Sequence, residues 1–159
     1  FIAGDEMIIN YLKYNMRSQV FAKSLQMQLV VGVRKRLDML KNNPEIRNNL
    51  WTNVEALQSG LRYQKFDLGT TQSCVTPVFL EGTIQEAMVM VKELREKYRI
   101  FCSIVVYPVI PKGLILLRLI PTASHKKVDI DETLLAFSKI RSKLMDRTYY
   151  KIAERMKTI

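Results

Sequence analysis

The feature that most constrains this chain is the segment of residues 107–121, Tyr-Pro-Val-Ile-Pro-Lys-Gly-Leu-Ile-Leu-Leu-Arg-Leu-Ile-Pro. Its two early prolines and its glycine predict a turn, and the apolar run that follows has the length of one β-strand. Arg118 is the one charged side chain in that run. A guanidinium keeps its charge and is costly to bury without a partner. It must therefore extend to water, pair with a carboxylate of the protein, or bind a carboxylate that arrives with a ligand.

Successive side chains of a strand point to opposite faces of its sheet. This alternation groups Arg118 with Leu114, Leu116 and Ile120, and places Ile115, Leu117 and Leu119 on the other face. Two interpretations of Arg118 remain open at this point. It is an edge arginine paired with a surface acid, or it binds the carboxylate of a substrate, for which arginine is the usual residue.

The remaining segments are predicted from the spacing of their apolar residues. Helices are expected from Asp5 to a break at residues 15–18, along an apolar stripe over residues 29–40, and from Pro44 to Leu61 with Trp51 anchoring the packing. Residues 17–24 are predicted to be irregular. A strand at 75–80, with Pro77 at a sheet edge, precedes a helix capped by Thr83 that runs to Tyr98. Strands at 101–106 and 114–120 and a last helix from 129 to about 155 complete the chain.

This order predicts an α+β fold, in which a small, mostly antiparallel sheet is covered by helices. The last two strands are expected to form a hairpin, and residues 83–99 a helical crossover. We interpret residues 44–159 as an α/β domain, and residues 1–43 as a helical segment that packs on this domain or on whatever precedes Phe1. The start at Phe1, within an apolar Phe-Ile-Ala-Gly segment, favours a piece of a longer polypeptide.

Composition limits the class of protein. The 159 residues are enough for one core, and no apolar stretch approaches the ~20 residues of a membrane span. No signal peptide is visible, and the two cysteines, Cys74 and Cys102, are expected to be reduced, which predicts a cytoplasmic protein. The net charge of +10 indicates either a solvated basic surface or an anionic partner, such as nucleic acid, a phosphate cofactor or a nucleotide-bearing substrate.

Two further parts of the sequence are candidate functional sites. His125, the only histidine, has no serine, cysteine or carboxylate at a spacing typical of catalysis, and no metal-binding pattern exists. Residues 17–24 carry Arg17, Lys23 and two serines just before a helix that starts near Gln26. The free N–H groups of a helix start, with an ammonium and a hydroxyl, can hold a phosphate. An ordinary capped helix start explains the same residues.

As a set, several segments resemble the C-terminal part of the α-oxoamine synthases. They are residues 1–4 (Phe-Ile-Ala-Gly), 17–18 (Arg-Ser), 21–25 (Phe-Ala-Lys-Ser-Leu), the predicted helix 45–61, residues 107–113, the strand with Arg118, and residues 122–125 (Thr-Ala-Ser-His). This family includes glycine C-acetyltransferase (2-amino-3-ketobutyrate CoA ligase), 8-amino-7-oxononanoate synthase, 5-aminolevulinate synthase and serine palmitoyltransferase. The resemblance implies the C-terminal domain of the fold-type I aminotransferase architecture. Residues 44–159 would then be the C-terminal α/β domain, and residues 1–43 the helical segment that connects it to the missing cofactor-binding domain. The resemblance also implies pyridoxal 5'-phosphate as cofactor, amino-acid and acyl-CoA substrates, and a homodimer.

By the same resemblance, Arg118 corresponds to the arginine that binds the amino acid's carboxylate. The segment around Phe21 to Ser24 corresponds to one that reaches the cofactor phosphate of the neighbouring subunit. The sequence departs from the family there, with Ala22 in place of a hydroxyl residue and with Gln26 and Gln28 in place of prolines. Lys23 or Ser24 would have to supply the donor that Ala22 lacks.

The resemblance places the Schiff-base lysine, the aspartate that pairs with the pyridine nitrogen and the stacking aromatic upstream of Phe1. We therefore expect no catalytic residue in this fragment, and no activity from it alone. For the complete protein, 2-amino-3-ketobutyrate CoA ligase-like activity on glycine is the first hypothesis. Serine palmitoyltransferase-like or 8-amino-7-oxononanoate synthase activity is the alternative. A degenerate, non-catalytic homologue and a basic non-catalytic module for an anionic partner are also open, although the scattered Lys and Arg residues argue against a nucleic-acid stripe.

Overall fold

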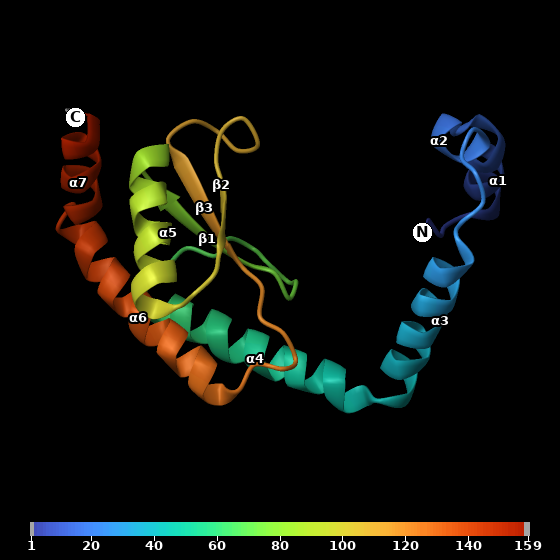
Figure 1. The fold of residues 1–159 in the computed structure, drawn as a ribbon, viewed down its shortest axis with the longest axis horizontal. Helices are drawn as coiled ribbons and strands as arrows, with labels where there is room; N and C mark the ends of the chain where they lie inside the picture. The colour runs from blue at the N-terminus through green and yellow to red at the C-terminus, as the bar shows by residue number, and fades with distance from the viewer. Residues whose placement is uncertain (1, 158–159) are drawn as a thin grey trace. The chain divides into compact units, whose positions relative to one another are not determined.

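The computed structural model describes residues 2–157, which fall into two compact units, Phe1–Asn42 and Asn43–Ile159 (Figure 1). Each unit is described by itself. Phe1, the first residue of the Phe-Ile-Ala-Gly segment, lies outside the described residues. Whether this division corresponds to the functional division inferred from the sequence stays a prediction.

The N-terminal unit consists of three helices, α1 (Glu6–Asn15), α2 (Arg17–Val20) and α3 (Met27–Asn42). Asp5 caps α1 by accepting a hydrogen bond from the N–H of Met7 at 2.9 Å, as the acidic start predicts. The segment predicted to be irregular contains the one-turn helix α2. None of the three helices has a buried residue. The apolar stripe of α3 is therefore exposed in the described part of the chain.

The C-terminal unit contains the helices α4 (Pro44–Tyr63), α5 (Ile84–Tyr98), α6 (Lys127–Met145) and α7 (Thr148–Lys157). Its strands are β1 (Thr76–Glu81), β2 (Ser103–Val105) and β3 (Leu114–Leu119). They form one sheet in the order β1-β3-β2, in which both pairs are antiparallel. The α+β class, the hairpin of β2 and β3, and the helical crossover through α5 are confirmed.

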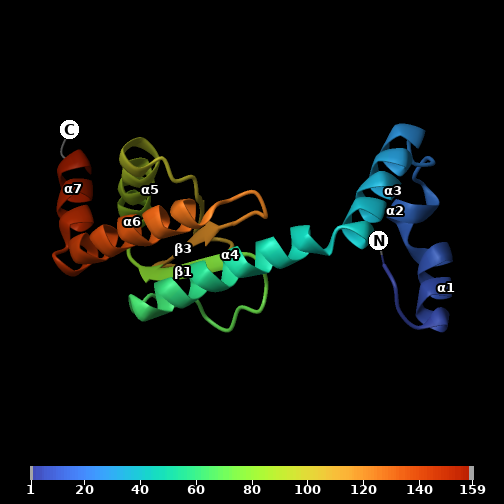
Figure 2. The same cartoon turned by 90° about the horizontal axis from the view of Figure 1, so that it is seen from below.

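Burial along β3 follows the predicted alternation. Ile115, Leu117 and Leu119 are buried, as is Val78 of β1, which pairs with Leu117. Helices α4, α5 and α6 pack on this face of the sheet (Figures 1 and 2). The opposite face carries Arg118, and no helix within residues 43–157 covers it (Figure 1).

Glycines and caps define the turns that join these elements. Thr83 and Glu86 form a capping box at the start of α5, with the Thr83 N–H donating to Glu86 Oε2 at 2.7 Å. Gly113 adopts φ +87° just before β3, and its carbonyl accepts from the N–H of Gly82 at 3.0 Å. The glycine of the segment 107–113 is therefore required by its backbone conformation.

Three predictions about helices are wrong. The last helix divides into α6 and α7, because Arg147 adopts a left-handed conformation with φ +53°, which an α-helix cannot continue. Trp51 does not anchor the packing, since it is 45% exposed and the buried residues of α4 begin at Asn53. The helical spacing of residues 84–98 predicts Met88 on the apolar stripe, but Met88 is exposed, and Ala87, Met90 and Leu94 are the buried residues of α5.

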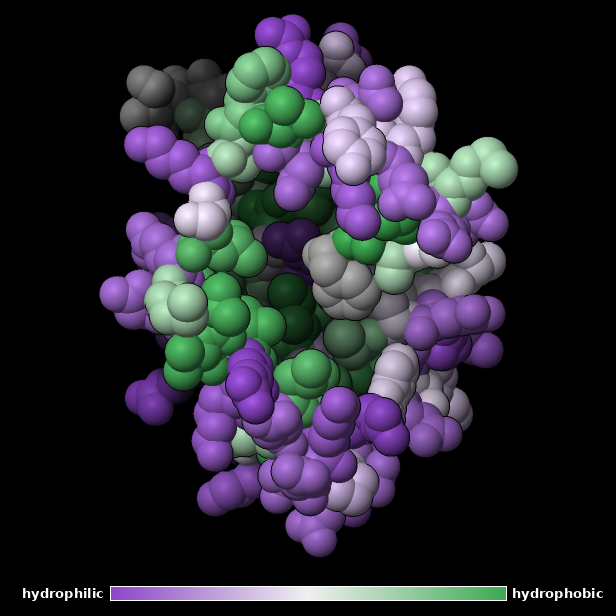
Figure 3. Space-filling view, turned by 90° about the vertical axis from the view of Figure 1, so that its right-hand side faces the viewer, coloured by the Kyte–Doolittle hydropathy of each residue, from purple (hydrophilic) through white to green (hydrophobic). Residues whose placement is uncertain are grey.

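No helix within residues 2–157 is long and apolar enough to cross a membrane. In the space-filling view, hydrophobic side chains lie exposed between hydrophilic ones (Figure 3). Cys74 and Cys102 are free thiols, of which Cys102 is buried.

Candidate functional site: the outer face of strand β3

Arg118 lies on the central strand of the sheet, on the face that points away from the core. Its cross-strand neighbours are Pro77 of edge strand β1 and Ser103 of edge strand β2. Leu114 and Leu116, which share its face, are exposed and half-buried. The strand thus fixes the backbone of Arg118 through pairing on both sides, while its side chain reaches solvent.

Within residues 2–157, the guanidinium of Arg118 has one hydrogen-bond partner. Its Nε donates to Ser103 Oγ at 3.0 Å. Among residues 2–157, no carboxylate lies within ion-pair distance of Arg118. Within the described residues, Arg118 is therefore not a structural arginine paired with a surface acid. The Arg118 side chain is exposed, and its Nη groups have no hydrogen-bond partner in the described part of the chain.

The turn that follows β3 is held by a residue of α4. The amide nitrogen of Asn53 donates to the carbonyl oxygens of Thr122 at 3.0 Å and of His125 at 2.8 Å. The N–H of Thr122 in turn donates to His125 Nδ1 at 2.9 Å. Since Nδ1 accepts this bond, the neutral ring carries its proton on Nε2. His125 therefore closes the turn between β3 and α6.

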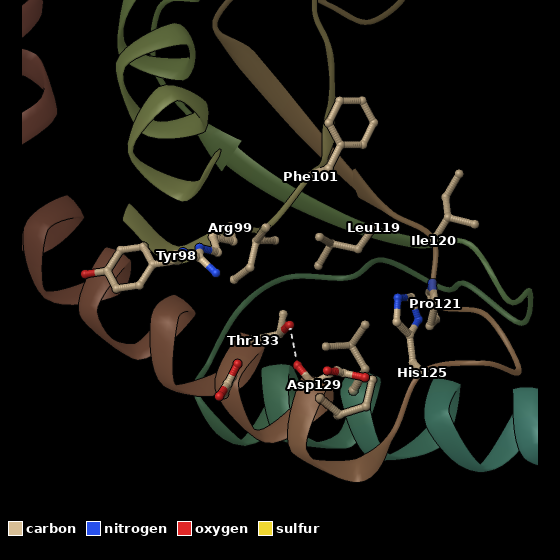
Figure 4. A pocket seen from close by; sticks show the side chains of 13 residues that line it. Tyr98, Arg99, Phe101, Leu119, Ile120, Pro121, His125, Asp129 and Thr133 are labelled. Carbon is tan, nitrogen blue, oxygen red and sulfur yellow. Dashed lines mark hydrogen bonds between the residues drawn. The ribbon is translucent and has the colours of Figure 1, made fainter. Parts of the chain in front are cut away.

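A cavity of about 470 Å³ lies at the end of β3 that leads into this turn (Figure 4). Leu119, Ile120 and Pro121 line it, together with residues of the α5–β2 link and of the first turns of α6. Its polar lining includes Arg99 and His125, which lie at opposite ends of the cavity in Figure 4. Arg118 does not line this cavity, because its side chain points to the other face of the sheet.

Lys23 and Ser24, the predicted cofactor-binding residues, lie in the exposed link between α2 and α3. Helix α3 begins a few residues later, and the carbonyl of Gln26 accepts from the N–H groups of Leu29 and Val30. The link thus offers an ammonium, a hydroxyl and a helix start, a donor set that fits a phosphate. Lys23 and Ser24 belong to one unit and Arg118 to the other, and each is described by itself.

A second polar cluster, which sequence reasoning missed, joins three helices. Glu93 of α5 accepts a hydrogen bond from the hydroxyl of Tyr149 on α7 at 2.8 Å, and one from Lys143 on α6. Burial acts to raise the pKa of Glu93, but the hydrogen bonds from Lys143 and Tyr149 outweigh it and hold that pKa below its usual value. Burial and the Glu93 carboxylate raise the pKa of the Tyr149 hydroxyl. The cluster is a structural tie, since Tyr149 is buried in the core.

Sequence reasoning also missed Asn53 and Ser103. Asn53 stands on the apolar stripe of α4, where a buried amide indicates a hydrogen bond to another element. Ser103 has no such indication, because only the β2–β3 register shows that it faces Arg118. No group of His, Cys, Asp and Glu residues within the described chain could hold a metal ion.

This chain is similar to known proteins in sequence and in fold. No protein-family model matches the chain. A cysteate-C-fatty acyltransferase of Capnocytophaga ochracea is 61% identical over 149 residues, which are 94% of this chain and 36% of that protein. An 8-amino-7-oxononanoate synthase of Petrotoga mobilis is 32% identical over 91% of this chain and 36% of that protein. The chain thus spans about a third of the length of the curated relatives it matches.

Solved structures agree with the sequence comparison. A structure of SPT with PLP internal aldimine matches with a TM-score of 0.73 and 28% identity, over 86% of this chain and 34% of that one. Both the helix-covered antiparallel sheet and the sequence therefore point to the same group of enzymes. The chain is related in sequence and in fold to the C-terminal domain of the pyridoxal-phosphate-dependent α-oxoamine synthases.

Proposed function

We propose that the complete protein condenses an amino acid with an acyl-CoA, and that Arg118 binds the carboxylate of the amino acid. The observation that carries this proposal is the position of Arg118 on the outer face of β3, without an acid partner within residues 2–157. A guanidinium binds a carboxylate through paired, charge-assisted hydrogen bonds. Arg118 anchors the substrate, and the chemical groups that act on its α-carbon come from outside this chain.

Pyridoxal phosphate, when bound, supplies the electron sink for a carbanion at the α-carbon of the amino acid. Lys23 and Ser24 are proposed to donate to its phosphate, across the interface of a homodimer. Their exposure and their place just before α3 support this role. Ala22 has no donor, so the contact rests on those two side chains.

For the substrates, the relative with 61% identity favours cysteate and a fatty acyl group. At this identity over 94% of the chain, it is a better guide than relatives near 30%. The 2-amino-3-ketobutyrate CoA ligase-like hypothesis, with glycine and acetyl-CoA, stays a prediction. Serine palmitoyltransferase-like activity, with serine and a long-chain acyl-CoA, and 8-amino-7-oxononanoate synthase activity are the alternatives. The net charge of +10 is compatible with a phosphate-rich acyl carrier. A cytoplasmic location is part of the proposal.

The test is a substrate panel with the complete protein loaded with pyridoxal phosphate. Cysteate, serine and glycine are each combined with palmitoyl-CoA, pimeloyl-CoA and acetyl-CoA, and products are identified by mass spectrometry. We expect the condensation product of cysteate and palmitoyl-CoA, with release of free CoA and carbon dioxide. A product from glycine and acetyl-CoA alone would replace this substrate assignment. No condensation product in any combination would contradict the proposed reaction.

A further inference from the structure

The geometry around Arg118 points to a second residue of the same site. We propose that Ser103 is a positioning residue that orients the Arg118 guanidinium. In this orientation the substrate carboxylate binds end-on, through both Nη groups of Arg118. The inference rests on the proposed function of Arg118. It adds how that side chain is held and by which edge it binds.

The register of the sheet brings the two residues together. Ser103 of β2 lies directly opposite Arg118 of β3, and the antiparallel pairing places both side chains on the outer face. Ser103 Oγ accepts from Arg118 Nε at 3.0 Å, a normal length for this bond. Ser103 is half-buried, and its bond to Arg118 lies on the exposed face of the sheet.

The other neighbour of Arg118 makes this orientation the preferred one. Pro77 lies directly opposite Arg118 on the β1 side and presents an apolar ring with no donor or acceptor. The guanidinium therefore has a hydrogen-bond partner on the β2 side of its strand and none on the β1 side. A side chain with many rotamers is thereby restricted before any ligand arrives.

The chemistry of the guanidinium then selects the binding edge. A carboxylate pairs with it either side-on, through Nε and one Nη, or end-on, through both Nη groups. The bond to Ser103 occupies the single N–H of Nε. The side-on edge is therefore closed, and the end-on edge stays available. The site is preorganised for a carboxylate that approaches along the axis of the arginine side chain.

The experiment uses the complete protein with pyridoxal phosphate bound and measures ligand dissociation constants from the absorbance change of the cofactor. Two ligands are compared, cysteate and the amine taurine, which keeps the amino and sulfonate groups but lacks the carboxylate. Ser103→Ala removes the acceptor, Ser103→Cys keeps the volume with a weak acceptor, and Ser103→Thr restores a hydroxyl. Ser142→Ala, which removes an exposed serine hydroxyl of α6, is the matched control.

Loss of one such hydrogen bond is expected to weaken cysteate binding by about 3- to 10-fold in Ser103→Ala and Ser103→Cys. Taurine binding is expected to stay unchanged, and Ser103→Thr is expected to return cysteate binding toward the wild-type value. If both ligands weaken equally, the effect is structural and the inference is wrong. If Ser103→Ala and Ser103→Cys bind cysteate normally while Arg118→Ala does not, the inference fails and the role of Arg118 stands. If Arg118→Ala also binds cysteate normally, both fail.

Discussion

Asn53 donates a hydrogen bond of 2.8 Å to the carbonyl oxygen of His125, which lies 72 residues further along the chain. The same amide nitrogen reaches the carbonyl of Thr122 at 3.0 Å. One side chain of α4 therefore holds both ends of the turn that joins the Arg118 strand to α6. Asn53 is buried, so water cannot fully replace these bonds.

Replacing Asn53 by alanine is predicted to lower the free energy of unfolding by about 1–3 kcal/mol, because two carbonyl oxygens lose a buried donor. Denaturant titration of the chain measures this loss. Gln58→Ala, which removes another buried amide of α4 with two hydrogen bonds, is the matched control for stability. In the complete protein, Asn53→Ala is expected to alter the turn after β3 as well. An unchanged free energy of unfolding in Asn53→Ala would show that the turn does not depend on the hydrogen bonds from Asn53.

The Glu93 cluster predicts a pH dependence. The pKa of Glu93 is lowered in the folded chain, so its contribution to stability is present above its ordinary value of 4.5 and is lost as pH falls through the folded pKa. The stability difference between wild type and Glu93→Gln should therefore shrink as pH falls below that value. A difference that stays constant from neutral to acidic pH would contradict the assignment.

Tyr149 tests the same cluster from the other side. Tyr149→Phe removes a hydrogen bond to a charged group and is predicted to cost about 1.5–3 kcal/mol of unfolding free energy. Since the pKa of Tyr149 is raised, the wild-type advantage should persist up to its ordinary value of 10.0 and decline at more alkaline pH. Tyr150→Phe, on the exposed neighbour, is the control and should leave stability nearly unchanged.

Gly60 tests the contact between α4 and α6. A Cβ at this position would clash with both methyl carbons of Leu134, so the Leu134 side chain would have to shift. Overpacking of about 1–3 kcal/mol should outweigh the gain of about 1 kcal/mol in helix propensity, so Gly60→Ala is predicted to destabilise. Adding Leu134→Ala should remove the clash, so the cost of Gly60→Ala should be smaller in that background. Equal costs in both backgrounds would place the strain elsewhere.

The thiols should differ in reactivity. Cys102 is 3% exposed, and burial raises its pKa to about 11, so little thiolate forms near neutral pH. Alkylation of the native protein at mildly alkaline pH, read by mass spectrometry of peptides, should modify the half-buried Cys74 first. Denatured protein should react at both positions. Rapid native alkylation of Cys102 would contradict its burial.

The sheet was predictable because the apolar pattern of β3 fits only one assignment of side chains to the two faces. Its alternation places Ile115, Leu117 and Leu119 inside and Arg118 outside, and the structure agrees. The division of α6 from α7 was not predictable, because the left-handed Arg147 interrupts a run with no glycine or proline. Trp51 failed as an anchor because only the second half of α4 meets the core.

The site was predictable in part, because one of its residues stands out in a local sequence pattern. Arg118 stands out as a charge in an apolar strand, and resemblance supplied its proposed role. Ser103 and Asn53 depend on contacts between residues 15 and 72 positions apart, which no local pattern specifies. Lys23 and Ser24 came from resemblance, and their role stays a prediction.

Arg118 makes the central contact of the proposed site, and one binding measurement tests that contact. In the complete protein with pyridoxal phosphate bound, Arg118→Ala should weaken amino-acid binding by about 2–4 kcal/mol, the value of a charge-assisted pair. Binding of the matching amine without a carboxylate should not change. We predict a selective loss of affinity for the carboxylate ligand, and an unchanged dissociation constant for the amino acid would contradict the proposed role of Arg118.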